Sequence, residues 1–251
     1  MEDIDDYFSK TVEGHGRSPP CNSIALMENL RKEAVVKKKE SKHDRRDKNL
    51  LFPPEHIWKF LSKNKVLSVF CCKCDFCEAV PGTADPVGVS DLAEALAGTA
   101  ANEAHDRTKR RLFCVLLFMG AGFLARHLCE IHTEGTGITP SEDTLRGLLT
   151  PLETRRLFRD TDRESKDITA RFMDIFGEAR KIFEAPKFKF GDNGTFMQNE
   201  NLPFLKEEPL PVLDRSGKNS RLFTFEIHSE YHEQDFPVCP LTILYRCTWL
   251  T

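Results

Sequence analysis

An apolar run between Arg111 and Arg126 constrains the fold more than any other feature of the sequence. The run spans 14 residues, from Leu112 to Ala125, whereas a helix that crosses a bilayer needs about 20. It therefore predicts a buried core helix and no membrane span. Gly120 and Gly122 interrupt it. Each glycine either weakens the helix by about 1 kcal/mol relative to alanine or allows a neighbouring backbone to pack closely.

Helical periodicity extends on both sides of this run. Pro53 and Pro54 suit the first turn of a helix, and apolar residues follow at helical spacing as far as Phe70. An apolar stripe over residues 166–184 predicts the clearest helix, which Pro186 ends. We therefore predict a mostly α protein with a multi-helix body, and assign residues 51–200 to a helical region.

Residues 1–50 lack a sustained apolar period and are predicted to form a flexible charged arm. The basic run KKKESKHDRR within them is typical of a nuclear-import or nucleic-acid patch, but a basic linker is the favoured interpretation. The net charge of -3 gives the chain no general bias toward nucleic acid or membranes. The opening MEDIDDYFSK lacks the apolar core of a secretory signal, so we expect a cytoplasmic or nuclear protein.

The chain has nine cysteines, and four of them crowd into a short segment: Cys71, Cys72, Cys74 and Cys77. Cys74-x-x-Cys77 has the spacing of half a zinc site, and structural zinc needs four ligands. Cys71 or Cys72 would be the third ligand, and His56 or a distant cysteine the fourth. Reduced thiols at a helix end are the favoured alternative. A redox C-x-x-C pair is less favoured, because no βαβ pattern surrounds it.

The pattern changes to that of strands near the C-terminus. Residues 221–228 (RLFTFEIH) alternate in part, which predicts a half-buried strand. Residues 205–213 are its predicted partner, and the loop between them contains Gly217. Pro209 and Pro211 predict that this partner is an edge strand or a broken one.

Several segments in this order resemble fungal protein-kinase-like proteins, which carry a helical region ahead of a divergent serine/threonine kinase domain. The segments are FPPEHIWKFLSKNKVLSVF with the cysteines after it, the apolar helix, ARFMDIFGEARKIFEAPKF, NLPFLKEEPL and LFTFEIHSEYHEQDF. The resemblance covers residues 52–236. It implies that 201–236 begins a kinase domain, in which Leu202-Pro203-Phe204 opens the first strand and Ile227-His228 ends the second.

The departures from that family argue against catalysis. A kinase glycine-rich loop lies over the ATP phosphates and needs several glycines, but the corresponding LDRSGKNSRLF has Gly217 alone, with the acidic Asp214 beside it. The third-strand lysine, the His-Arg-Asp loop and the Asp-Phe-Gly metal site are absent. We therefore expect no catalytic residues, no cofactor other than a candidate zinc, and no ATP binding beyond the degenerate loop at Gly217.

The tail, residues 237–251, does not resemble the family and is expected to be poorly packed. Its abrupt departure suggests a frame change, an unspliced intron or an early stop. Three interpretations stay open. The favoured one is a non-catalytic, truncated kinase-like protein that acts as an interaction module with a protein partner. The others are an incomplete serine/threonine kinase and a zinc-stabilised helical protein-binding module.

Overall fold

The computed structural model describes residues 21–33, 36–37, 50–80, 86–97, 104–131, 139–154, 168–185, 204–209, 220–227, 231 and 245–248. The chain divides into two compact units. Residues 1–34 and 55–183 form the first, called the helical unit here. Residues 35–54 and 184–251 form the second, called the strand unit.

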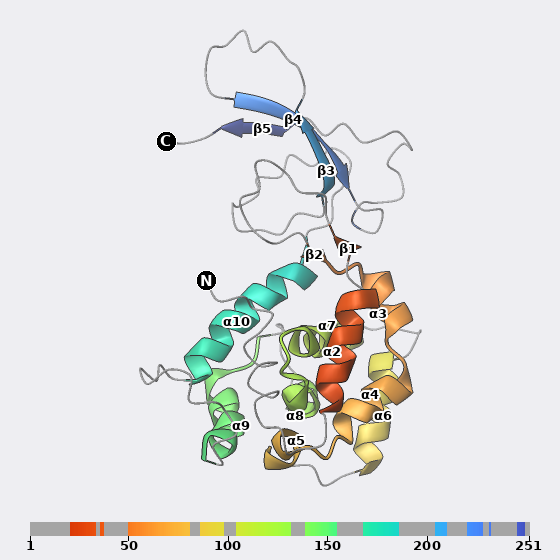
Figure 1. The fold of residues 1–251 in the computed structure, drawn as a ribbon, viewed down its shortest axis with the longest axis vertical. Helices are drawn as coiled ribbons and strands as arrows, with labels where there is room; N and C mark the ends of the chain where they lie inside the picture. Colours follow the sequence, from red (N-terminus) through yellow and green to blue (C-terminus); the bar gives the residue numbers. More distant parts are fainter. Residues whose placement is uncertain are drawn as a thin grey trace. The chain divides into compact units, whose positions relative to one another are not determined.

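The helical unit holds the helices in the described part of the chain (Figure 1). In chain order they are α2 (Asn22–Glu33), α3 (Pro54–Phe60), α4 (Lys63–Phe70), α5 (Asp75–Ala79), α6 (Pro86–Ala97), α7 (Ala104–Phe118), the 3-10 turn η1 (Gly122–Leu124), α8 (Ala125–Ile131), α9 (Glu142–Thr154) and α10 (Ile168–Phe183). The described part is mostly helical, which confirms the prediction of a mostly α protein.

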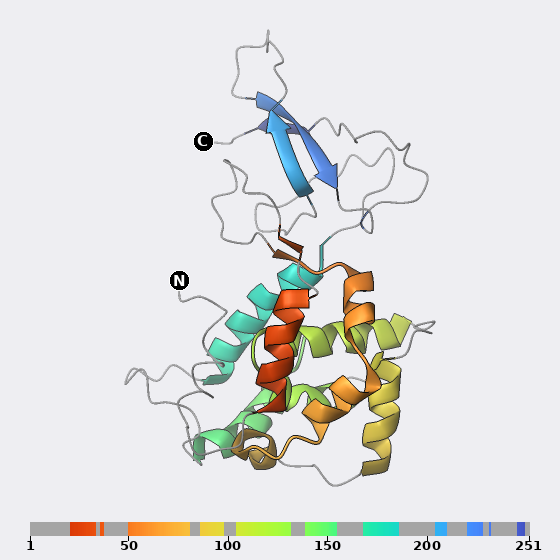
Figure 2. The same cartoon turned by 45° about the vertical axis from the view of Figure 1, so that its right-hand side comes forward.

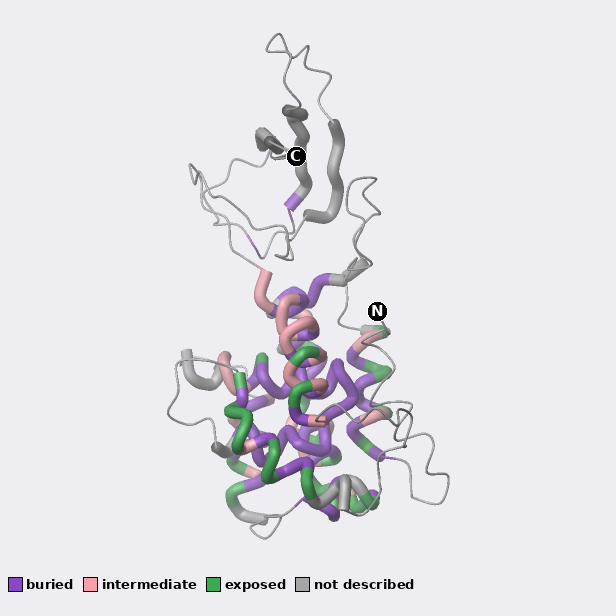
Figure 3. The backbone as a smooth tube through the Cα atoms, turned by 90° about the vertical axis from the view of Figure 1, so that its left-hand side faces the viewer, coloured by how far each residue is buried: buried purple, intermediate pink, exposed green. Residues whose placement is uncertain are grey.

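Helix α7 lies at the centre of this unit, with α2, α6, α8 and α10 packed against it. Residues 112–119 are all almost completely buried, as the sequence predicted for the apolar run. Aromatic side chains fill the surrounding space: Phe113 meets Phe70 edge-on with ring centroids 5.7 Å apart, and Phe118 meets Phe183 in the same way at 5.9 Å. Figure 3 shows buried residues (purple) in the interior of the helical unit and exposed residues (green) on its outside.

The apolar run does not continue as one helix, because Gly120 ends α7. Gly120 has a φ of 79°, which costs glycine little. The N–H of Ala121 donates to the Leu116 carbonyl at 2.8 Å, and that of Gly120 donates to the Leu117 carbonyl at 3.0 Å. This bond pair is a Schellman cap. The chain then turns into η1 and α8, so the run becomes two packed segments.

The prediction of a flexible arm over residues 1–50 was wrong for residues 22–33, whereas residues 1–20, 34–35 and 38–49 lie outside the described residues. Residues 22–33 form α2, which packs on α7 and α4 (Figure 2). Leu26, Met27 and Leu30 are 5%, 2% and 0% exposed. Their spacing gives α2 one short apolar face. The face covers only two turns, and the basic residues that follow it obscured the pattern in the sequence.

The strand unit contains a three-stranded sheet in the order β3-β4-β5. Strand β3 (Phe204–Pro209) pairs antiparallel with β4 (Ser220–Ile227), and β4 pairs antiparallel with β5 (Tyr245–Thr248). A two-residue pair, β1 (Val36–Lys37) with β2 (Leu50–Leu51), belongs to the same unit. The Tyr231 hydroxyl donates to the Phe52 carbonyl at 2.9 Å and joins the two parts of this unit.

The structure also changes the predicted boundaries at this end of the chain. Strand β3 spans Phe204–Pro209 and so begins one residue before the predicted 205–213, whose residues 210–213 lie outside the described residues. Residues 245–248 of the tail form β5, where we expected poor packing, because the edge of β4 offers backbone partners. Gly217 lies outside the described residues. The likeness of this hairpin to a kinase stays a prediction.

Among the described residues, no helix is long and apolar enough to cross a membrane.

Candidate metal centre

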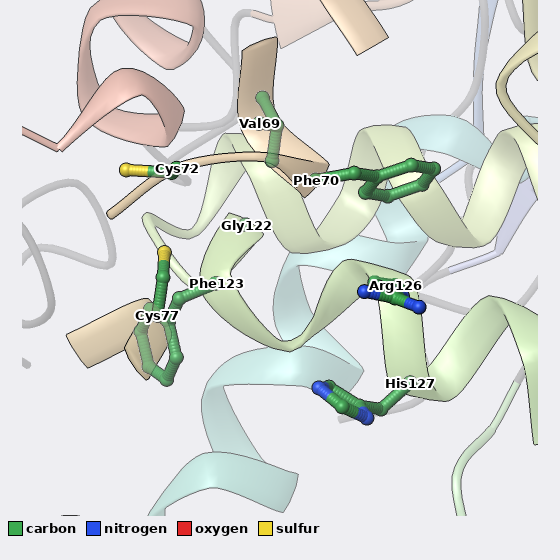
Figure 4. A pocket seen from close by; sticks show the side chains of 8 residues that line it. All are labelled: Val69, Phe70, Cys72, Cys77, Gly122, Phe123, Arg126 and His127. Carbon is green, nitrogen blue, oxygen red and sulfur yellow. The ribbon is translucent and has the colours of Figure 1, made fainter. Parts of the chain in front are cut away.

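Four cysteines from two distant parts of the sequence meet in the helical unit. They are Cys21, Cys72, Cys74 and Cys77, and their sulfur atoms all lie within 4.8 Å of one another. We call this group the thiol cluster. Cys21, Cys74 and Cys77 are buried and Cys72 is partly buried, and all four are free thiols. Figure 4 shows the side chains of Cys72 and Cys77 beside the turn at Gly122.

Three members of the thiol cluster come from the α4–α5 connection and from α5 itself. The Ser62 hydroxyl caps the start of α4 by accepting from the Lys65 N–H. The helix ends where the Cys71 N–H donates to the Leu67 carbonyl and the Cys72 N–H to the Val69 carbonyl. Cys74 lies at the N-cap of α5, and Cys77 follows one turn later. Two short helices with a tight connection therefore bring Cys72, Cys74 and Cys77 together.

The fourth member, Cys21, lies directly before α2. Its carbonyl accepts from the Ile24 N–H at 3.0 Å and starts the helix. The next residue, Asn22, fixes this end of α2 on α4: its backbone N–H donates to Cys72 Sγ at 3.4 Å, and its Nδ2 donates to the Ser68 carbonyl at 2.8 Å. The Ser23 hydroxyl lies 2.9 Å from Cys21 Sγ. These contacts place Cys21 Sγ 4.0 Å from Cys72 Sγ.

A close approach of α2 to η1 supports this arrangement. A Cβ atom added to Gly122 would lie only 2.6 Å from Ser23 Cβ and 2.9 Å from Leu117 Cδ2. Glycine at this position therefore lets the start of α2 pack directly on the turn after α7. This is the close-packing role that the sequence left open for Gly122.

The thiols influence one another's ionisation strongly. Hydrogen bonds from Cys21, then Cys74 and Cys77, lower the pKa of Cys72 far below its usual range, and the Asn22 N–H adds to this. The pKa of Cys21 falls to about 7: its bond with Cys72 raises the pKa, but those with Cys74, Cys77 and Ser23 lower it.

The other two thiols resist ionisation. The pKa values of Cys74 and Cys77 are raised above the usual range, chiefly because each shares hydrogen bonds with Cys21 and Cys72. Without a metal, the cluster therefore stabilises a thiolate at Cys72 with protons held by its neighbours. Removing all of those protons places like charges side by side, which a bound divalent cation would offset.

The geometry of the thiol cluster fits zinc. Zinc binds four thiolates tetrahedrally at Zn–S distances of about 2.3 Å, which puts the sulfur atoms about 3.8 Å apart. The Cys21–Cys72 separation of 4.0 Å is close to this value. The other sulfur atoms are no more than 4.8 Å apart, so small side-chain movements would bring all four to the distances that zinc requires. The Asn22 N–H that donates to Cys72 Sγ is also typical of the hydrogen bonds that orient metal ligands.

Three of the four predicted metal ligands, Cys72, Cys74 and Cys77, lie in the thiol cluster. Cys71 does not: it is exposed at the C-cap of α4, and its neighbour Cys72 has the position nearer Cys21. The sequence left His56 or a distant cysteine as the fourth ligand, and the structure places Cys21 there, while His56 lies on α3. The sequence does not reveal Cys21 as a ligand, because its segment lacks a sustained apolar period and predicts a flexible arm.

The buried cysteines of α7 and α8 are separate from the thiol cluster. Cys114 and Cys129 are fully buried. Cys129 Sγ donates to the Lys109 carbonyl at 3.7 Å, and burial raises the pKa of Cys114 above its usual range. Such residues act as small apolar core residues.

Comparison of the chain with protein-family models, with curated proteins and with solved structures finds no match. The functional conclusion therefore depends on the chemistry of the thiol cluster and on the fold around it.

Proposed function

We propose that this chain is a zinc-stabilised helical protein-binding module, in which one Zn²⁺ is held by the thiol cluster. The observation that carries this proposal is the convergence of four cysteine sulfur atoms within 4.8 Å, from segments 51 residues apart in the sequence. Four thiolates are the ligand set of closed structural zinc sites. Soft sulfur ligands also disfavour magnesium and calcium.

The role of the zinc would be structural. Four protein ligands fill a tetrahedral site and leave no position for a water molecule or a substrate, unlike the three-ligand sites of zinc enzymes. The metal would instead join the start of α2 to the α4–α5 connection. Helix α2 has 12 residues, and an isolated helix of that length is marginal in water. Zinc would therefore help to keep α2 packed on α7, and recognition of a protein partner would fall to the module's surface.

Metal analysis of the purified chain tests the proposal directly. We expect one zinc per chain by mass spectrometry of the elements, and a lower melting temperature after a strong chelator is added. Cys21→Ser should lose the zinc and melt at the temperature of the chelated parent. Cys71→Ser is the matched control, since it removes an exposed thiol next to the cluster and should keep both properties. Metal-free protein whose melting does not change with chelator, or protein loaded with iron, would contradict the proposal.

A second candidate is the non-catalytic kinase-like protein that the sequence favoured. One observation supports it: the pairing of β3 with β4 places Phe204 of the Leu-Pro-Phe segment opposite Ile227 of the Ile-His pair. The third strand, β5, contains Arg246 and no lysine. Under this proposal, Mg-ATP should leave the melting temperature unchanged. A nucleotide-dependent shift, or a transcript that continues past the Phe236 codon into the missing kinase motifs, would favour the incomplete kinase instead.

A further inference from the structure

The four thiols of the cluster differ in their access to solvent. Cys21, Cys74 and Cys77 are 3%, 2% and 9% exposed, whereas Cys72 is partly exposed. Cys72 and Cys77 both border a small pocket, whose lining includes Phe123, Arg126 and His127 (Figure 4). Cys72 is therefore the member of the thiol cluster that is most exposed to solvent.

Cys72 also has a nearby partner on another segment. Its Sγ lies 4.0 Å from Cys21 Sγ, and a disulfide bond has an S–S distance of about 2.05 Å. Closing this gap needs about 2 Å of movement by two side chains. The backbone is already held in place, since Asn22 donates to Cys72 Sγ and to the Ser68 carbonyl.

We propose that the metal site is also an oxidative modification site, at which a hydroperoxide oxidises Cys72 first and Cys72 then forms a disulfide with Cys21, releasing zinc. This inference rests on the zinc site proposed above and adds its regulation. The two observations that carry it are the greater exposure of Cys72 and the short Cys72–Cys21 separation.

The reaction consumes one hydroperoxide for each disulfide. The Cys72 thiolate attacks the peroxide oxygen, the O–O bond breaks, and Cys72 becomes a sulfenic acid while hydroxide (for H₂O₂) leaves. The Cys21 thiolate then attacks Cys72 Sγ, the S–O bond breaks, and a second hydroxide leaves as the disulfide forms. With two protons taken up, the products are one disulfide and two waters. The two thiolates have lost two electrons and the peroxide has gained them.

The choice of partner decides what oxidation does to the fold. Once Cys21 and Cys72 are joined, only Cys74 and Cys77 remain as ligands, too few for a structural zinc site. The new disulfide still links the start of α2 to the end of α4, so α2 stays attached when zinc leaves. A Cys74–Cys77 disulfide would also release zinc, but it would leave Cys21 without a covalent link to the end of α4.

The test uses the full-length, zinc-loaded chain and stepwise additions of H₂O₂. Released zinc is followed with a colorimetric chelator, and disulfides are mapped by proteolysis and mass spectrometry after free thiols are blocked. We expect the Cys21–Cys72 disulfide to form first, with one zinc released per disulfide. Cys71→Ser should give the same disulfide and the same zinc-release rate within about twofold, and a reducing agent with added zinc should restore the loaded form.

Two results would overturn the inference. One is a Cys74–Cys77 disulfide, or one that contains Cys71, as the first product. The other is retention of zinc after Cys21 and Cys72 have been joined. Zinc measured before any oxidant is added reports on the proposed function alone. A chain purified without zinc overturns that function and the zinc-release step together, whereas a zinc-loaded chain that forms another first disulfide overturns this inference only.

Discussion

The centre of the helical unit and the thiol cluster both contain cysteine, in opposite roles. In the centre, Cys114 lies on α7 and is completely buried, and this burial keeps its proton in place by raising its pKa. In the thiol cluster, the pKa of Cys72 is lowered, first by the hydrogen bond from Cys21. Burial alone makes a thiol inert, whereas convergence with other thiols makes it a candidate metal ligand.

The two regions also differ in how they stabilise the fold. The centre is held by area removed from water and by ring packing, neither of which depends on metal. The thiol cluster joins segments that are far apart in sequence, and its polar, ionisable atoms have little hydrophobic contribution to offer. A bound metal would stabilise the fold there, because its binding free energy adds to the free energy of folding. This contrast gives four predictions, beginning with the largest expected effect.

Truncating a core side chain should destabilise the protein most, with no effect on zinc binding. Phe176 is fully buried and stacks on Phe172 with ring centroids 6.0 Å apart. Phe176→Ala should lower the free energy of unfolding by about 3–5 kcal/mol, because it leaves a cavity, while zinc content stays at one per chain. Chemical denaturation with and without chelator measures both. Met173→Ala, on the partly exposed side of α10, is the control and should cost much less.

The pH dependence of zinc binding should identify the protons that the cluster holds. Zinc must displace the protons of Cys74 and Cys77, whose pKa values are raised, and also that of Cys21 below its pKa of about 7. The metal-free form therefore binds more protons than the zinc form, and affinity rises with pH. Competition with a chelator of known affinity should show zinc affinity falling by roughly two to three orders of magnitude per pH unit lost. A pH-independent affinity would show that the thiols are not the ligands.

A methyl group at Gly122 should affect both regions, because this residue lies between them. Gly122→Ala places a Cβ 2.6 Å from Ser23 Cβ, and such overpacking costs about 1–3 kcal/mol of unfolding free energy. It should also weaken zinc binding, since Ser23 follows Cys21 closely. Ser23→Gly in the same chain removes the clashing atom and should restore part of the loss. Gly147→Ala, where an added Cβ meets no atom within 4 Å, is the control.

The far end of α2 should affect stability alone and leave zinc binding unchanged. Arg31 donates from its guanidinium to the Phe118 carbonyl at 2.6 Å and lies over the Phe118 ring. Arg31→Ala should lower the free energy of unfolding by about 1.5–3 kcal/mol, the range for a hydrogen bond to a charged group, with zinc affinity unchanged. Lys32→Ala, one residue along and exposed, should have almost no effect. If Arg31→Ala released zinc, the contacts at the two ends of α2 would stabilise the helix cooperatively and not independently, which would contradict this prediction.

The accuracy of the sequence predictions depended on how local each signal was. The stripe over 166–184 predicted α10 closely, because an apolar face over four turns leaves few alternatives. Helix α2 was missed, since its apolar face covers two turns and a basic segment follows. Cys74-x-x-Cys77 indicated half a metal site through spacing alone, and the exclusion of Cys71 depends on where α4 ends.

The sequence by itself determined that a 14-residue apolar run must be buried, and that Cys74 and Cys77 have the spacing of metal ligands. Only the tertiary structure decided that Cys21 completes the group and that Gly122 allows α2 to approach. The physical reason is that helix periodicity and C-x-x-C spacing are properties of neighbouring residues. A meeting of Cys21 with Cys72 instead depends on how α2 packs on α4 and on α7, which no local pattern records.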